Sequence, residues 1–439
     1  MFICEHQPAP APGRGGAQPE PRSLAVTRRE LLGATAALGA AGGLAPRSTA
    51  NRGRDGDSPL ASGQRIRRVA YAYLEAPRWK TVGRNSQLGL HGDAAGDGIM
   101  RIETDAGAIG VGQTWTGEAE AGRALLGADP LSFYRPGAGV ESPLGRFDWP
   151  LWDLVARILD VPLWRLFGGY GPEWVPVYDG SIYFTDLEEE ALRPAELGTG
   201  IPRVLKEVER ALERGHRAFK IKVGRGNRWM SDREAGLRRD IEVVRAIRQL
   251  VGPSVRFMVD ANDGYDLATT KRFLEGAEDD FFFVEEMFPE EIDQDLALKA
   301  WMKSRRWKTL LADGESADEV DHFRPYIEAR AMDVLQPDMR GLGFARMLEL
   351  ARMTAQTGIL VNPRNWGSCL GLPMQLQLAR GIPNFGLAEE DPGLLPYFEY
   401  PGYVPREGRM SVPDTPGSGL LFHEDRFLAE RAYDWVVEP

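Results

Sequence analysis

The chain has 439 residues, of which 43% are hydrophobic and 27% are charged, as is typical of a soluble globular protein with a large core. Its formal net charge of −11 argues against nucleic-acid binding, because a nucleic-acid-binding surface needs a basic patch. The two cysteines, Cys4 and Cys369, exclude a disulfide framework, since Cys4 lies in a segment that we expect to be removed.

Residues 1–50 have the features of an export leader. The first 23 residues are rich in Pro, Gly and Ala, which predicts disorder. Arg28 and Arg29 then precede a weakly apolar run, Leu31 to Ala45, that is too short and too rich in Gly and Ala for a stable membrane span. This pattern predicts a twin-arginine signal and a periplasmic or extracellular location. A chance arginine pair before a disordered tail is the alternative. Residues 51–64 are typical of a linker.

Residues 65–170 predict an α+β domain. The alternating segment RIRRVAYAYLEA predicts a strand, and IMRIET and AIGVGQTW predict a hairpin around a turn at Asp105-Ala106-Gly107. In FDWPLWDLVARILDVPLWRLFGG the apolar residues have helical spacing from Trp152 to Ile158, and we expect this helical segment to end at Gly168-Gly169.

Residues 171–395 have a regular rhythm of short apolar runs with helical patterns between most of them. The eight runs are VPVYDG, FKIKV, RFMVDAN, FFFVEEMF, TLLADGE, MDVLQPD, GILVNPR and NFGLAEE. Continuous apolar strands that alternate with helices predict a parallel sheet covered by helices, and eight such units predict a (β/α)8-type barrel. A doubly wound sheet is disfavoured, because no glycine-rich dinucleotide fingerprint follows the first strand. We expect residues 396–439 to pack back on the α+β domain.

Acidic residues follow three consecutive predicted strands: Asp260 in VDAN, Glu285 in FVEE and Glu315 in DGES. The carboxyl ends of barrel strands meet at one rim, so these side chains would converge and raise one another's pKa unless a divalent cation lay between them. Oxygen-only ligands favour Mg²⁺. Three unrelated solvated acids are the alternative. Because neighbours in a strand alternate, we expect Glu286 to point away from Glu285.

Two lysines, Lys220 and Lys222, stand two residues apart in FKIKV and therefore point to the same side of their strand. Facing the helices would bury two unpaired charges, so we expect both at the barrel mouth, opposite the carboxylates. There each ammonium would lower the other's pKa, while nearby acids would raise it, and a lysine closer to neutrality can act as a base. Alternatively, the lysines only neutralise the acids. A metal and a lysine together suggest removal of the proton α to a metal-bound carboxylate.

The motifs KIK, VDAN, FVEEMFP, DGES, QPD and PNFGLAE occur in an order and at a spacing that resemble the mandelate racemase and muconate lactonizing enzyme branch of the enolase superfamily. The resemblance covers about residues 65–400, and the segment DWPLWDLVARILDVPLWRLFGG resembles the capping-domain helix of that family. It implies a (β/α)8-type barrel with an N-terminal α+β capping domain completed by the C-terminal segment.

The resemblance also implies roles for the residues at the rim. The Mg²⁺ ligands would be Asp260, Glu285 and Glu315. Lys222 would be the general base, with Lys220 as its electrostatic neighbour. Capping loops around residues 79–90 would close the mouth and read the rest of the substrate. The remaining candidates are Glu389, which would bind or polarise the substrate, the dyad aspartate Asp338, and two polar strand-end residues expected to contact substrate, Asn262 and Asn362.

One departure from the family concerns Arg364. The racemase-like subgroup carries a histidine after the seventh strand, paired with an aspartate after the sixth. Here Asp338 is present, but Arg364 occupies the histidine position in VNPRNWG. Arginine stays protonated in proteins and is a poor base. It could pair with Asp338, or grip a second carboxylate or a leaving hydroxyl with two hydrogen bonds.

A lone base favours dehydration of a hydroxy (sugar) acid to a 2-keto acid, which is a lyase reaction. A racemase or epimerase with another second base is the runner-up, and a non-catalytic metal-dependent binding protein is a third reading. In each case the expected partner is a small-molecule carboxylate. Members of the family commonly form even-numbered assemblies, so a homo-oligomer is a further expectation.

Overall fold

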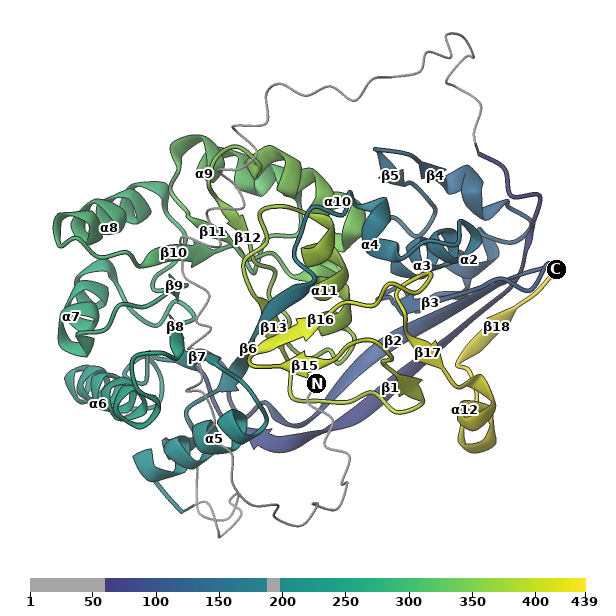
Figure 1. Ribbon diagram of the computed structural model, residues 1–439. Helices are drawn as coiled ribbons and strands as arrows, with labels where there is room; N and C mark the ends of the chain where they lie inside the picture. Colours follow the sequence, from purple (N-terminus) through teal and green to yellow (C-terminus); the bar gives the residue numbers. More distant parts are fainter. Residues whose placement is uncertain (1–59, 188–197) are drawn as a thin grey trace, which may run out of the picture.

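The computed structural model describes residues 60–187 and 198–439 (Figure 1). The predicted export signal and most of the predicted linker lie outside the described residues. Among the helices of the described part, none combines the length and apolar character that a bilayer crossing requires.

The N-terminal domain is an antiparallel sheet backed by helices. Its strands β1 (Ile66–Val82), β2 (Gly92–Thr104) and β3 (Ile109–Gln113) follow in order, and the predicted hairpin is confirmed by the pairing of β2 with β3. Helix α3 (Trp149–Ile158) packs on β3 so closely that a Cβ at Gly110 would lie 2.5 Å from the carbonyl oxygen of Pro150. Glycine is therefore required there. The short elements of this domain are α2 (Ala119–Arg123), η1 (Pro130–Phe133), β4 (Tyr134–Arg135) and β5 (Gly139–Val140).

The helical segment expected to run to Gly168-Gly169 is interrupted. Helix α3 ends at Ile158, and α4 (Leu163–Leu166) begins after a break. Asp160 has a left-handed φ of 53°, and Pro162 precedes the first residue of α4. Both features stop a continuous helix, because a left-handed residue turns the chain and a proline disfavours helical geometry in the residue before it.

The second domain contains eight parallel strands, which supports the predicted barrel type. They are β6 (Trp174–Ile182), β7 (Ala218–Lys222), β8 (Arg256–Asp260), β9 (Phe283–Glu285), β10 (Leu310–Asp313), β11 (Val334–Leu335), β12 (Leu360–Val361) and β13 (Ala388–Glu390). The spatial order is β13-β6-β7-β8-β9-β10-β11-β12. The ring is not closed by a continuous ladder, since β12 meets the segment before β13 only through an isolated bridge between Val361 and Phe385.

Helices cover the outside of this sheet (Figure 1). In α5 the apolar residues Val204, Val208 and Ala211 recur at helical spacing and are buried. Aspartates accept a backbone N–H at the start of α6, α7 and α10. The helices and 3₁₀ turns are η2 (Thr185–Leu187), α5 (Ile201–Glu213), α6 (Arg233–Val251), α7 (Leu267–Ala277), α8 (Ile292–Ser304), η5 (Val320–Phe323), α9 (Arg324–Ala329), α10 (Met339–Thr354) and α11 (Gly371–Gly381).

The side-chain alternation of β7 decides what faces the barrel interior. Phe219 and Ile221 belong to the apolar cluster between the sheet and its helices, whereas Ala218 belongs to the cluster that fills the barrel interior. Lys220 and Lys222 share the side of Ala218 because alternate residues of a strand point the same way. The two lysines therefore face inward, as expected.

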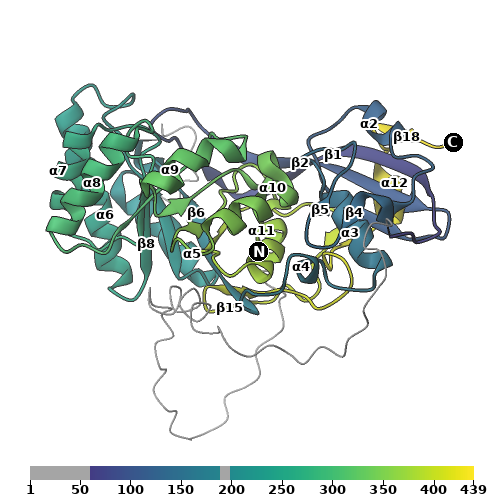
Figure 2. The same ribbon diagram turned by 90° about the horizontal axis from the view of Figure 1, so that it is seen from above.

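The C-terminal segment contacts both domains. Its elements are β14 (Phe398–Glu399), β15 (Pro405–Arg406), β16 (Arg409–Ser411), β17 (Leu421–Phe422), α12 (Glu424–Glu430) and β18 (Trp435–Val437). Strand β16 pairs with β6 of the barrel, and β18 pairs with β1 of the N-terminal domain. Figure 2 shows α12 and β18 within the N-terminal domain, at a distance from the barrel helices.

Candidate active site

A pocket lies where the barrel rim meets the N-terminal domain. Residues within or just after six of the eight strands line it together with a loop that joins β1 to β2. The lining residues are Asn85, Leu88, His91, Tyr183, Lys220, Lys222, Asn262, Glu315, Arg364, Trp366 and Glu389. Most of the residues singled out from the sequence are therefore brought together.

The two lysines end β7 inside a ring of acceptors. Lys220 Nζ lies 2.9 Å from Glu285 Oε1, 3.1 Å from Glu389 Oε1 and 3.3 Å from an oxygen of Asp260. Lys222 Nζ donates to Asp260 and, over 2.8 Å, to Asn262 Oδ1. Both lysines are buried, so each charge depends on these partners.

The nearby carboxylates affect the pKa values of the two lysines more than the lysines affect each other. Burial, the largest single effect, lowers the pKa of Lys222, but the charges of Asp260 and of neighbouring acidic groups, Glu315 among them, together outweigh burial and raise that pKa above its ordinary value. The pKa of Lys220 is raised as well, by Glu285 and Glu389 against the effect of burial. Of the two opposing effects expected from the sequence, the one exerted by the acids therefore prevails among these side chains. A divalent cation on the same carboxylates would oppose their effect and lower both pKa values.

Three buried carboxylates form a compact group beside the lysines. Asp260, Glu285 and Glu286 each offer an oxygen, and these oxygens lie within 4.8 Å of one another. The expectation that Glu286 points away from Glu285 is wrong. Glu286 lies just beyond the end of β9 and has a left-handed φ of 42°, so strand alternation no longer applies to it. Its carboxylate accepts a 2.7 Å hydrogen bond from Asn262 Nδ2.

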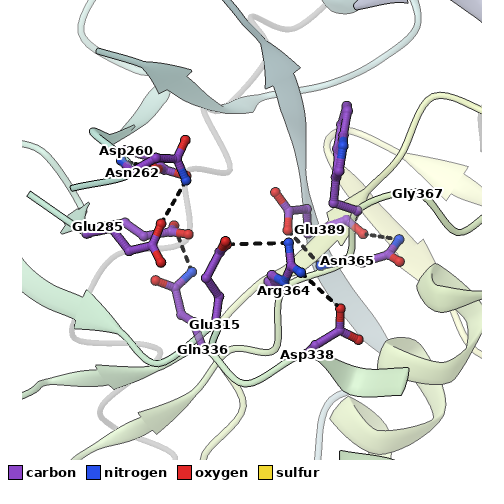
Figure 3. A network of polar contacts seen from close by, with 12 residues as sticks. Asp260, Asn262, Glu285, Glu315, Gln336, Asp338, Arg364, Asn365, Gly367 and Glu389 are labelled. Atoms are coloured by element: carbon purple, nitrogen blue, oxygen red, sulfur yellow. Dashed lines mark hydrogen bonds and ion pairs between the residues drawn. The ribbon is translucent and has the colours of Figure 1, made fainter. Parts of the chain in front are cut away.

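Glu315, the third ligand expected from the sequence, lines the same pocket but stands outside this compact group. Its Oε2 lies 3.5 Å from Nη1 of Arg364. Figure 3 shows Glu315 between Glu285 on one side and Arg364 on the other. Glu286 thus joins Asp260 and Glu285, whereas Glu315 lines the same pocket on the side of Arg364.

The donor set fits a divalent cation. Burial raises the pKa of Glu285 to about 8, with the charges of Asp260 and Glu389 adding to the effect of burial. Burial and the charges of Glu315 and Asp260 also raise the pKa of Glu286 well above its ordinary range. A hard cation would remove this repulsion, and carboxylate oxygens are the ligands that such cations prefer. Gln336 Nε2 donates to Glu285 Oε2 over 2.9 Å and holds that carboxylate in place.

Arg364 is anchored on the opposite side of the pocket. Its Nη2 lies 3.3 Å from Asp338 Oδ2, and Asp338 also accepts the backbone N–H groups of Arg340 and Gly341 at the start of α10. Arg364 Nε is buried and finds no hydrogen-bond partner among the described residues. The side chain is a permanent cation at the position where the racemase-like subgroup carries a histidine.

Glu389, at the end of the eighth strand, connects the two sides. Its Oε1 lies 3.1 Å from Lys220 Nζ, and its Oε2 accepts the backbone N–H of Asn365 over 2.7 Å. Gly180 of β6 leaves space for this carboxylate, since a Cβ at Gly180 would collide with Oε1. Glu389 is therefore fixed beside Lys220 in the lining of the pocket.

Comparison with known proteins places this arrangement in a family. The profile of the family described as Enolase C-terminal domain-like matches residues 203–426, which is just over half of the chain. The chain belongs to the enolase superfamily. The resemblance drawn from the sequence motifs, to the mandelate racemase and muconate lactonizing enzyme branch, is confirmed.

Several relatives of this superfamily member act on sugar acids. It is 29% identical to a 3,6-anhydro-alpha-L-galactonate cycloisomerase of Streptomyces coelicolor, over 74% of this chain and 89% of the relative. It is 26% identical to a D-xylonate dehydratase of Haloferax volcanii, over 74% of this chain and 83% of the relative.

Solved structures agree with these relatives. A galacturonate dehydratase from Geobacillus sp., solved with D-galacturonate and 5-keto-4-deoxy-D-galacturonate, matches with a TM-score of 0.76 and 29% identity. That match covers 86% of this chain and 100% of the other. A mandelate racemase/muconate lactonizing protein from Geobacillus sp., complexed with magnesium and tartrate, matches with a TM-score of 0.78 and 28% identity, over 86% and 98% of the two chains.

Asn362 and His91 of this superfamily member differ from the sequence-based expectation of which residues line the pocket. Asn362 is not among the pocket-lining residues, because its Oδ1 accepts the backbone N–H of Leu387 and so ties β12 to the start of β13. His91 lies one residue beyond the capping loop expected at residues 79–90, and it does line the pocket.

Tyr183 and Trp366 are pocket residues that sequence reasoning missed. Their rings stack 4.9 Å apart, and the His91 ring meets Tyr183 edge-on at 4.7 Å. They follow the first and seventh strands by only a few residues, so their positions near the barrel rim were the available signal. Aromatic residues in loops are too common for that signal to identify them without the structure.

Proposed function

We propose that this chain is a Mg²⁺-dependent dehydratase that converts a hydroxy (sugar) acid into a 2-keto acid. The observation that carries the proposal is the placement of one lysine base, Lys222, beside a buried carboxylate cluster, with a permanently protonated arginine where a second base would stand. The sugar-acid dehydratases among its relatives support the same reaction class.

We assign the cation to Asp260, Glu285 and Glu315, with Glu286 adjoining them. When bound there, Mg²⁺ supplies positive charge that stabilises the negative charge developing on the substrate carboxylate. Magnesium is present in the structures of related proteins, and the donor set described above favours a hard cation.

The chain's own groups carry the proton transfers. Lys222 Nζ takes the proton from the carbon next to the substrate carboxylate. Lys220, in contact with Glu285 and Glu389, stays charged and keeps both carboxylates oriented. Lys222 then returns the proton to the departing hydroxyl on the same face. One C–H and one C–O bond break, water leaves, and the enol product becomes the 2-keto acid.

Arg364 favours elimination over inversion. Inversion needs a group on the other face that can exchange a proton, and a guanidinium does not do so near neutral pH. Its N–H groups can instead donate hydrogen bonds to a substrate hydroxyl that does not leave.

The test is incubation of the purified protein and Mg²⁺ with a panel of aldonic and uronic acids, followed by NMR in D₂O. Release of 2-keto acids is the expected result. Recovered substrate of inverted configuration, without keto acid, would assign the protein to the racemases and epimerases. Mg²⁺-dependent binding with neither reaction would make it a binding protein.

We also propose that residues 1–50 direct export by the twin-arginine route, on the strength of the Arg28-Arg29 pair before a weakly apolar run. A reporter fused to this leader should leave the cytoplasm. Replacing both arginines with lysine should retain the reporter inside, and unchanged export of that variant would refute the assignment.

A further inference from the structure

The pocket has a charged side and an uncharged side. The lysines and carboxylates described above form the charged side, together with Arg364. The uncharged side is formed by the β1–β2 loop and by the aromatic residues after β6 and β12: Asn85, Leu88, His91, Tyr183 and Trp366. A substrate whose carboxylate lies at the metal must place its other end against this second side.

The cations that line the pocket already have carboxylate partners. Lys220 contacts Glu285 and Lys222 contacts Asp260. Arg364 contacts Asp338, a carboxylate that it shares with Arg340, and it would keep that contact if Glu315 turned toward a cation. Among the described lining residues there is therefore no cation left without a carboxylate partner for a second substrate carboxylate, and burying an unpaired carboxylate is costly.

A further cation lies behind the aromatic wall but is also committed. Arg78 makes two hydrogen bonds to Asp391, of 2.9 and 2.8 Å, and its guanidinium lies 4.5 Å from the centre of the Trp366 ring. Trp366 thus stands between this ion pair and the pocket. The side of the pocket formed by His91, Tyr183 and Trp366, called the distal wall below, is therefore aromatic and neutral.

His91 supplies a hydrogen-bond acceptor on this wall. Its Nδ1 lies 3.0 Å from the carbonyl oxygen of Gly83, and a carbonyl only accepts, so Nδ1 carries the proton. Burial lowers the pKa of His91 to about 4, and the charge of Lys222 adds to this effect, so the ring is neutral near pH 7. Nε2 then holds the lone pair. It can accept from a hydroxyl, but it has no proton to offer a carboxylate.

The loop that carries the acceptor is held against the barrel. Ser86 Oγ donates to the carbonyl oxygen of Asn262 over 2.8 Å, and Trp229 Nε1 donates to that of Asn85 over 2.6 Å. The stacked rings of Tyr183 and Trp366 pack against His91. Aromatic faces suit the C–H groups of a polyhydroxy chain, and a prepositioned acceptor suits its hydroxyls.

We propose, on the basis of the dehydratase function above, that the substrate is a monocarboxylic polyhydroxy acid rather than a dicarboxylic one, and that His91 accepts a hydrogen bond from a hydroxyl distant from the reacting carbons. The charge balance of the pocket supports the preference for a monocarboxylic acid. The position and tautomer of His91 support its role as the acceptor of a hydroxyl hydrogen bond.

Matched pairs of sugar acids test the first part. D-Galactonate and galactarate, or D-gluconate and D-glucarate, share their stereocentres and differ only in a terminal hydroxymethyl or carboxylate group. With Mg²⁺ we expect kcat/KM for the monoacid to exceed that for its diacid by about 10-fold or more. Equal or faster turnover of the diacid would overturn the inference while leaving the dehydratase function intact.

Binding separates the two proposals if turnover is absent. Calorimetry on the Lys222→Met protein with Mg²⁺ should show tighter binding of the monoacid of a pair. Tighter monoacid binding without turnover in the unmodified protein would refute the proposed function and support the inference. Tighter binding of the diacid would overturn the inference, and Mg²⁺-dependent binding of neither acid would refute both.

Three variants of His91 test the second part. His91→Phe keeps the ring packing but removes the acceptor, and should raise KM about 10-fold with little change in kcat. His91→Gln retains an acceptor and should restore most of the loss. His91→Arg adds a cation to the distal wall and should shift the diacid-to-monoacid ratio of kcat/KM upward by about 10-fold. Circular dichroism first checks that each variant is folded. Equal effects of the three substitutions, or an unchanged KM in His91→Phe, would then refute the role of His91 as a hydrogen-bond acceptor for the substrate.

Discussion

Nη1 of Arg364 lies 3.5 Å from Oε2 of Glu315, so a permanent cation touches a carboxylate that the family pattern assigns to the metal. The same guanidinium contacts Asp338 through Nη2. One side chain thus links the expected metal site to the remaining half of a histidine–aspartate dyad. This link explains how the site can keep its carboxylates together while lacking a second base.

Replacing Arg364 with histidine should restore a group that exchanges protons on that face. We expect Arg364→His to incorporate solvent deuterium into recovered substrate and to produce some inverted isomer, both read by NMR in D₂O. Arg364→Met is the matched control, because it removes the cation without adding a base, and it should lose dehydration without gaining exchange. If Arg364→His still dehydrates the substrate but exchanges no proton with solvent, position 364 is not equivalent to the histidine position of the racemase-like subgroup.

Replacing Lys222 with methionine should remove the base while preserving its bulk. We expect kcat to fall by about 10²–10⁴-fold, the usual contribution of a general base, with Mg²⁺-dependent binding of substrate retained. Lys303→Met, on the exposed surface of α8, serves as a control that should leave kcat unchanged. Residual activity of Lys222→Met near that of the unmodified protein would assign the base to another group.

Lys220 should affect binding as well as the reaction. Its ammonium contacts Glu285, Asp260 and Glu389, so Lys220→Met leaves buried carboxylates without their counter-charge. We expect both a lower kcat and a weaker Kd for substrate, measured by kinetics and calorimetry. An effect confined to kcat, equal to that of Lys222→Met, would instead indicate that the two lysines share the proton transfer.

Mg²⁺ should raise the melting temperature of the protein, since a ligand that binds only the folded state stabilises it, and a chelator should reverse the rise. Glu285→Gln should abolish the rise. Glu315→Gln should weaken Mg²⁺ binding more than Glu286→Gln, because the motif pattern of the family assigns Glu315, and not Glu286, to the cation. The opposite order would make Glu286 the third ligand.

Arg225 should be important for stability. Its guanidinium lies 2.7 Å from Asp186 and 2.6 Å from Asp240, and all three side chains are buried. Arg225→Met removes the main counter-charge of two buried carboxylates and should lower the free energy of unfolding by about 3–5 kcal/mol, measured in urea. Arg239→Met is the control, because Arg239 is partly exposed and lies 3.5 Å from Asp186. This substitution should lower the free energy of unfolding far less.

Strand ends were the most predictable part of this site. Lys220, Lys222, Asp260 and Glu285 were placed correctly because alternation within a strand and the shared rim of a parallel barrel are both readable from spacing. Glu286 was misplaced because a left-handed residue just beyond a strand reverses the alternation, and spacing does not reveal φ. The spacing likewise did not reveal that Asn362 Oδ1 accepts the backbone N–H of Leu387, just before β13.

The sequence by itself determined the barrel type, the family and the rim positions of the lysines and of the first two carboxylates. These follow from periodicity and motif order, which are local properties of the chain. Only the tertiary structure decided which charges neutralise which, that Glu286 joins the carboxylates while Arg364 holds Glu315, and that His91 closes the far wall. Those outcomes depend on distances between segments remote in the chain, and electrostatic energy varies with such distances and with burial.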